Sequence, residues 1–177
     1  MLAFWRQAGP ERWFAAAPDF DSTLHESFAV PHGEAACGKL SSWEQDASGA
    51  LALILLTDQI PRNIFRHSAH AFATDEMARN IADRALARGF DQATEPGLRV
   101  FFYLPFEHHE DASSQARAVA LCEKLSAETG AKNWLDYAQL HQGLISRFGR
   151  FPHRNLVLGR VSTPEEIAYL AQGGFAG

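Results

Sequence analysis

The fold is decided by TDQIPRNIFR, residues 57–66, which follows the most hydrophobic stretch of the chain, residues 50–56. We expect that aliphatic stretch to form a buried helix, because it is far shorter than the roughly 18 apolar residues of a membrane-spanning helix. Pro61 has no backbone donor, so it should kink or break the helix near that point. Helical character then resumes through Arg66.

Three charged residues of this stretch are spaced one helical turn apart. Asp58 stands four residues before Arg62, and Arg62 stands four before Arg66. A helix would therefore place one carboxylate and two guanidiniums on the same face. One interpretation is a salt-bridged ladder that ties two helices together. The other is a ligand-binding role for these three residues together with Asn63.

Helical patterns also dominate the rest of the chain. Phe20, Leu24 and Phe28 recur every four residues, and Asp19 is placed to cap that helix. Other helices are predicted at residues 74–89, 98–104, 111–129, 133–148 and from 163 on, where Thr163 and Glu166 form a capping box. No stretch shows the sustained alternation of a strand. We therefore predict an all-α fold, one compact helical domain over residues 1–177 with about seven to nine helices.

Composition limits the classes of partner. The chain has 177 residues, and its 16 basic and 21 acidic residues leave a net charge of -5. This charge disfavours nucleic acid and anionic membranes as partners. Cys37 and Cys122 are far apart and match no disulfide or zinc pattern. The N-terminal residues lack a secretory signal, so we expect a cytoplasmic protein with no membrane association.

A second unusual segment is PFEHHED, residues 105–111, in which five titratable groups precede a predicted helix. Capping of that helix explains some of these groups. Glu107, His108 and Glu110 are otherwise candidate catalytic residues, since carboxylates and imidazoles exchange protons. Gln115, one turn further on, is a candidate ligand-binding residue. The spacing matches no dedicated metal motif, so we predict no metal site, and the sequence indicates no cofactor.

A third segment, RFGRFPHRN at residues 147–155, is rich in arginine, and only three of the chain's 16 basic residues are lysines. Arginine makes bidentate contacts with carboxylates and phosphates. A buried guanidinium without a partner costs several kcal/mol, so these side chains need either internal acids, such as Asp58, Glu107 or Glu110, or an anionic ligand. An internal ion-pair network and an anion-binding pocket both remain open.

The candidate residues of this third segment fall into two groups. His153 is a candidate proton donor or acceptor. The candidate ligand-binding residues are Arg147, Arg150, Arg154 and Asn155. His141, on the preceding predicted helix, is either a core histidine or a further ligand-binding residue that faces the same place.

Together the three segments resemble the signature of an uncharacterised bacterial family, domain-of-unknown-function family 924. The resemblance extends from Phe4 and Trp5 to the Thr-Pro-Glu-Glu sequence that starts at Thr163. Thr57, Ile60 and His67 depart from the pattern, but none of them removes a polar group from the candidate site. The resemblance implies a tetratricopeptide-repeat-like α-α superhelix and no established activity.

Two functions follow, and the sequence leaves open whether the chain is an enzyme. In the first, the three segments converge on a cleft where the arginines bind an anionic small molecule and the histidines and glutamates exchange protons with it. In the second, the chain is a tetratricopeptide-repeat-like module that binds a protein or peptide partner, and the charged motifs only hold its helices in register. We rank the small-molecule pocket first.

Overall fold

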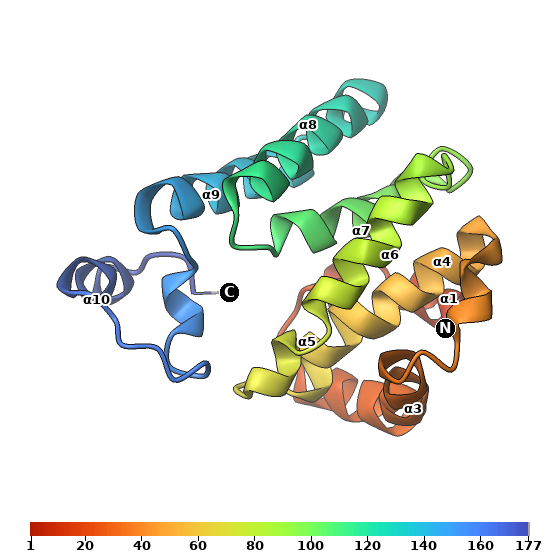
Figure 1. Ribbon diagram of the computed structural model, residues 1–177, viewed down its shortest axis with the longest axis horizontal. Coiled ribbons are helices and arrows are strands. Elements are labelled where there is room, and N and C mark those ends of the chain that lie inside the picture. Colours follow the sequence, from red (N-terminus) through yellow and green to blue (C-terminus); the bar gives the residue numbers. More distant parts are fainter. Residues whose placement is uncertain (177) are drawn as a thin grey trace. The chain divides into compact units, whose positions relative to one another are not determined.

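The computed structural model describes residues 1–176, and every regular element in that range is helical (Figure 1). The α-helices are α1 (Leu2–Ala8), α2 (Pro10–Trp13), α3 (Pro18–Ala36), α4 (Ala47–Ile54), α5 (Ile60–Ile64), α6 (Asp75–Ala87), α7 (Pro96–Glu107), α8 (Ala112–Thr129), α9 (Asn133–Phe148) and α10 (Pro164–Ala171). Four short turns of 3-10 or π type are η1 (Ser41–Gln45), η2 (Leu55–Gln59), η3 (Ala69–Phe72) and η4 (Pro152–Arg154). The all-α prediction is confirmed.

The number of helices also lies in the predicted range. The segments α4, η2 and α5 follow one another without a gap, so residues 1–176 hold nine helices when these three are counted as one. Among the described helices, none combines the length and apolar character that a bilayer crossing requires.

The chain divides into two compact units, each described here by itself. The first comprises residues 1–66 and 70–105. The second comprises residues 67–69 and the described residues from 106 on. The single domain over residues 1–177 remains a prediction, and its last residue lies outside the described range.

An aromatic cluster and the buried helix α4 form the core of the first unit. The rings of Trp5 and Trp13 stack with centroids 6.2 Å apart, and each meets the edge of Phe101, at 5.6 and 5.0 Å. The indole nitrogen of Trp13 donates to the Trp5 carbonyl at 2.7 Å. α4 packs against α6, and α3 packs against α5.

The α-helix is interrupted near Pro61, as expected, since α4 ends at Ile54 and α5 begins at Ile60, but the chain between them stays helical. The helix continues through the proline by widening into the π turn η2, in which the Ile60 N–H bonds the Leu55 carbonyl, five residues back. A regular turn would need an N–H at Pro61 and would press its ring against the Thr57 carbonyl. The wider turn accommodates the proline.

Side chains from elsewhere in the first unit supply the donors that this turn lacks. The carbonyl oxygens of residues 56–58 accept hydrogen bonds, at 2.8, 2.6 and 2.6 Å respectively, from His32, Thr74 and Arg62. A carbonyl can only accept, so Nδ1 of His32 must be the donor. The turn is thereby tied to α3 and to the start of α6.

The starts of two helices, α3 and α6, differ from what the sequence pattern indicates. The helix expected over residues 19–28 begins at Pro18, after the N-cap Ala17, and continues to Ala36. Thr74 does stand at the N-cap of α6, but its side chain makes no capping bond. Its hydroxyl donates instead to the π turn, because the buried carbonyl there has a greater need of a donor.

In the second unit, α8 and α9 lie side by side as a helical hairpin (Figure 1). Asp111 caps α8 by accepting from the backbone N–H groups of Ser113 and Ser114, and Gly130 ends it at a φ of 77°. The capping box at Thr163 is present at the start of α10. The predictions at these helix ends are confirmed. They could be made from the sequence because a cap depends only on residues within a few positions.

We expect Thr74→Val to lower the free energy of unfolding by roughly 1–3 kcal/mol, since a buried carbonyl would lose its donor while the side-chain shape is kept. Urea denaturation measures the loss. Thr23→Val is the matched control, because the Thr23 hydroxyl bonds a carbonyl on the exposed side of α3. Equal losses in the two variants would contradict the role of Thr74 in the turn.

Candidate functional site

Three predicted residues of the first segment, Arg62, Asn63 and Arg66, contact acids of the first unit, and the fourth, Asp58, is one of these acids. The guanidinium of Arg62 donates to both carboxylate oxygens of Asp75, at 2.9 and 3.0 Å, and lies 3.3 Å from the Asp58 carboxylate. Burial alone would lower the pKa of Arg62, but the two carboxylates raise it. Arg62 is therefore cationic and joins α5 to the start of α6.

Arg66 and Asn63 share one acid on α3. Arg66 donates to the two Asp21 oxygens at 2.5 and 3.1 Å, and the Asn63 amide donates to the same carboxylate at 2.9 Å. These contacts are of the kind expected if the charged residues of this segment tie helices together by salt bridges. A ligand role for this segment, and its convergence with the other two segments, remain predictions.

In the second unit, Glu110 connects the second segment to the third. Its carboxylate accepts a hydrogen bond from the Phe151 N–H at 2.7 Å and one from each terminal nitrogen of Arg160, at 2.6 and 3.0 Å. Burial alone would raise the pKa of Glu110, but the hydrogen bonds from Arg160 and Phe151 outweigh this effect. The pKa of Glu110 is therefore below its ordinary value. Glu110 is thus an ionised structural partner of Arg160, a residue outside the predicted site.

Glu166 gathers the next predicted residues. It accepts two hydrogen bonds from Arg150, at 2.7 and 2.9 Å, and one from the amide of Asn155 at 3.1 Å. The bond from Arg150 is the main cause of the lowered pKa of Glu166, about 2. Arg147 pairs with the exposed Glu165 at 2.8 Å.

A surface hollow of about 490 Å³ runs along these two ion pairs. Its lining residues are Arg147, Phe148, Arg150, Thr163, Glu165 and Glu166. Two carboxylates offset the two guanidiniums, so the hollow has no excess positive charge with which to bind an anion.

The second unit also contains a buried carboxylate–imidazole pair. Nδ1 of His141, on α9, lies 2.9 Å from the Tyr137 carbonyl and 3.1 Å from the Glu107 carboxylate, and both residues are buried. The carbonyl can only accept, so Nδ1 carries the hydrogen. Nε2 is then the acceptor of the neutral ring, and it makes no hydrogen bond within residues 1–176.

The surroundings keep this imidazole neutral. Burial is the main cause that lowers the pKa of His141 to about 3, against the opposing effect of the Tyr137 carbonyl. Charge interactions with His108, Arg154 and His153 lower it further. The guanidinium of Arg154, which stays cationic, would attract an anion that approached the ring.

Aromatic rings surround the same imidazole. The His141 ring lies 6.4 Å from His108, 5.3 Å from Phe151 and 4.9 Å from Phe175, between centroids. Arg154 lies 4.5 Å above the Phe151 ring and donates to the His108 carbonyl at 3.0 Å.

His153 completes the group, with its ring 5.7 Å from Phe151 and 5.4 Å from Phe175. The name histidine cluster is used below for Glu107, His108, His141, His153 and Arg154. All five are predicted site residues. Phe151 and Phe175 are not, because an aromatic residue in a helical sequence is usually explained by the core.

Two neighbours of the cluster have structural roles. The amide of Gln115, a predicted ligand-binding residue, donates to the carbonyls of Glu107 and His109 at 2.6 and 2.7 Å and so fixes the end of α7. Burial, with a further effect from the Glu107 charge, raises the pKa of Cys122 to about 12, so this thiol is not a nucleophile. No group of three or more potential metal ligands occurs in the part of the chain that the structure describes.

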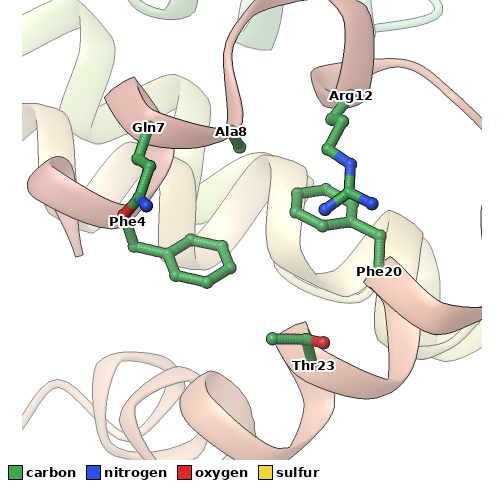
Figure 2. Close-up of a pocket in the computed structure, with 6 residues that line it drawn as sticks. All are labelled: Phe4, Gln7, Ala8, Arg12, Phe20 and Thr23. Atoms are coloured by element: carbon green, nitrogen blue, oxygen red, sulfur yellow. The ribbon is translucent and has the colours of Figure 1, made fainter.

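A separate pocket of about 260 Å³ lies in the first unit (Figure 2). It is lined by Phe4, Gln7, Ala8, Arg12, Phe20 and Thr23. Arg12 lies 5.4 Å above the Phe20 ring and pairs with the exposed Asp19 at 3.1 Å. None of the predicted site residues lines this pocket, and no charged motif marks it in the sequence.

The all-α fold and the histidine cluster define a helical protein with a buried carboxylate–imidazole pair. The chain belongs to the family described as "Bacterial protein of unknown function (DUF924)", whose model matches residues 1–174. The resemblance inferred from the sequence is therefore confirmed at the level of the family. The tetratricopeptide-repeat-like superhelix remains a prediction.

A solved structure supports the same relationship. The chain is similar to ATU0120, a protein of unknown function from Agrobacterium tumefaciens, with a TM-score of 0.92 and 48% sequence identity. The similarity covers 97% of this chain and 95% of that chain. No curated protein matches the sequence.

The lowered pKa of His141 predicts a specific pH dependence. The ordinary value of 6.5 applies to the unfolded chain, which therefore binds the proton first, and the stability present above that value is lost as the pH falls toward 3. The loss is at most about 1.4 kcal/mol per pH unit. We expect the free energy of unfolding to fall between about pH 7 and pH 5, and to fall less in His141→Gln.

Chemical denaturation across this window measures the two slopes. The pKa values of Glu110, Asp111 and Glu166 are lowered, so these three carboxyl groups titrate below this window. The exposed His25 on α3 offers a matched control, and His25→Gln should keep the wild-type slope. An unchanged slope in His141→Gln would refute the buried neutral imidazole.

Proposed function

We propose that the protein binds an anionic small molecule at the histidine cluster and exchanges a proton with it through His141. The observation that carries the proposal is the buried pair of His141 and Glu107, which leaves Nε2 as the acceptor. A carboxylate that fixes the tautomer and orientation of an imidazole is a recurring arrangement in acid–base catalysis.

The charges around the ring support an anion as the ligand. Burial, and to a lesser extent charge interactions with Arg154 and the two neighbouring histidines, lower the pKa of His141, so the free ring is a hydrogen-bond acceptor and a weak base. A bound anion would offset the charge interactions and raise the pKa of His141 from this lowered value. Ligand binding and proton uptake are therefore coupled.

The alternative function, a module that binds a protein or peptide, is supported by a different observation. Leu156 is 90% exposed and Val161 is 88% exposed, both in the segment between η4 and α10. The internal pairing of Arg66, Arg147 and Arg150 is also what this alternative requires. Scattered apolar residues are common on protein surfaces, so the histidine cluster ranks first.

Thermal unfolding in the presence of phosphate, aliphatic carboxylates, aromatic carboxylates and unrelated peptides tests the proposal. A ligand at about a hundred times its dissociation constant adds roughly 2.7 kcal/mol to the stability of the folded state. We expect an anion to stabilise the wild type and His25→Gln but not His141→Gln.

Calorimetric titration of that anion in two buffers of different ionisation enthalpy then counts protons. The wild type should take up about one proton per bound anion, because the pKa of His141 rises on binding. Binding of an anion without proton uptake would contradict the proton exchange. Stabilisation by a peptide alone, undiminished in His141→Gln, would favour the interaction module.

A further inference from the structure

The end of the described chain folds back onto the histidine cluster. Phe175 meets His141 at 4.9 Å and His153 at 5.4 Å between centroids, with interplanar angles of 68° and 80°. Its ring therefore fills a slot between two imidazoles. The ring of Phe151 contacts both of these histidines as well.

Two glycines make this return possible. Gly173 has a φ of 80°, a left-handed conformation that other residues rarely adopt. A Cβ on Gly174 would come within 2.4 Å of the Tyr169 ring. The turn closes when the Phe175 N–H donates to the Tyr169 hydroxyl at 2.8 Å.

Contacts that do not involve Phe175 hold both sides of this slot. Nδ1 of His141 bonds its own helix at the Tyr137 carbonyl and lies near the Glu107 carboxylate. The backbone before His153 is held by the bond from the Phe151 N–H to Glu110. These contacts do not require the tail to be seated.

We infer that the slot is the subsite for an aromatic ring of the ligand, and that Phe175 occupies it in the absence of that ligand. This inference rests on the proposed function, and it narrows the ligand to a small aromatic acid. A space that holds a phenyl ring between two imidazole edges fits another phenyl ring of the same size. The carboxylate of the ligand would lie near the guanidinium of Arg154, whose charge acts on His141.

Three probes separate the ring from the charge. 3-Phenylpropionate has both, 3-phenylpropanamide has only the ring, and hexanoate has only the carboxylate. Binding is followed by NMR through the imidazole resonances of His141 and His153, in the wild type and in Phe175→Ala. Leu140→Ala is the control, since it truncates an apolar side chain that is 39% exposed on the same helix.

We expect Phe175→Ala to bind 3-phenylpropionate about tenfold more tightly than the wild type does. The apparent affinity of the wild type is reduced to the fraction of time in which the slot is open, and a tenfold effect corresponds to an open fraction of about one tenth. Leu140→Ala should bind as the wild type does, and hexanoate should bind weakly to all three proteins. In the wild type, a saturating probe should also move the amide resonances of Gly173 and Gly174, since the tail is displaced.

Two results would overturn the inference. The first is a folded Phe175→Ala that binds neither aromatic probe. The second is binding to Phe175→Ala alone, with no binding to the wild type and its tail amides unmoved, which would make the slot part of the core. Gly174→Val provides a second way to open the slot if Phe175→Ala does not fold, since its side chain should unseat the tail.

The outcomes also separate this inference from the proposed function. Ring binding without proton uptake would retain the subsite and reject proton exchange by His141. Proton uptake with phosphate or hexanoate, together with failure of both aromatic probes, would retain the proposed function and reject the subsite.

Discussion

A guanidinium or carboxylate buried without a partner costs several kcal/mol, and the structure depends on how each such group is paired. Arg62 meets Asp75 and thereby fixes the start of α6 beside the π turn. Arg160 meets Glu110, which also accepts the backbone N–H that precedes η4. These pairs bring together segments that are distant in the sequence, so most of the conspicuous charge in the chain serves to hold the fold.

The Glu107–His141 pair meets the same requirement, but one nitrogen of its imidazole is left as a hydrogen-bond acceptor. Nδ1 of the imidazole donates to the Tyr137 carbonyl and lies 3.1 Å from the carboxylate, whereas Nε2 makes no hydrogen bond within residues 1–176. The pair is held in place by Gln115, which bonds the Glu107 carbonyl. An oriented acceptor is what distinguishes this group from the structural ion pairs.

Sequence reasoning succeeded where the cause is local. The caps at Asp111 and Thr163 were predictable because both partners lie within one turn. The π turn at Pro61 was not, since its donors come from His32 and Thr74, 29 and 13 residues away along the chain. Spacing likewise identified His141 as a candidate but not Glu107 as its partner, because the two residues are 34 positions apart and meet only in the folded chain.

The most direct test of the account is the protonation state of the two ring nitrogens of His141, measured by ¹⁵N NMR from about pH 8 to pH 4 and assigned with His141→Gln. We predict a hydrogen on Nδ1, none on Nε2, and no change across this range, since the pKa of His141 is about 3. A hydrogen on Nε2 at neutral pH, or a doubly protonated ring at about pH 6, would contradict the central claim that Glu107 holds a neutral imidazole with Nε2 as its acceptor.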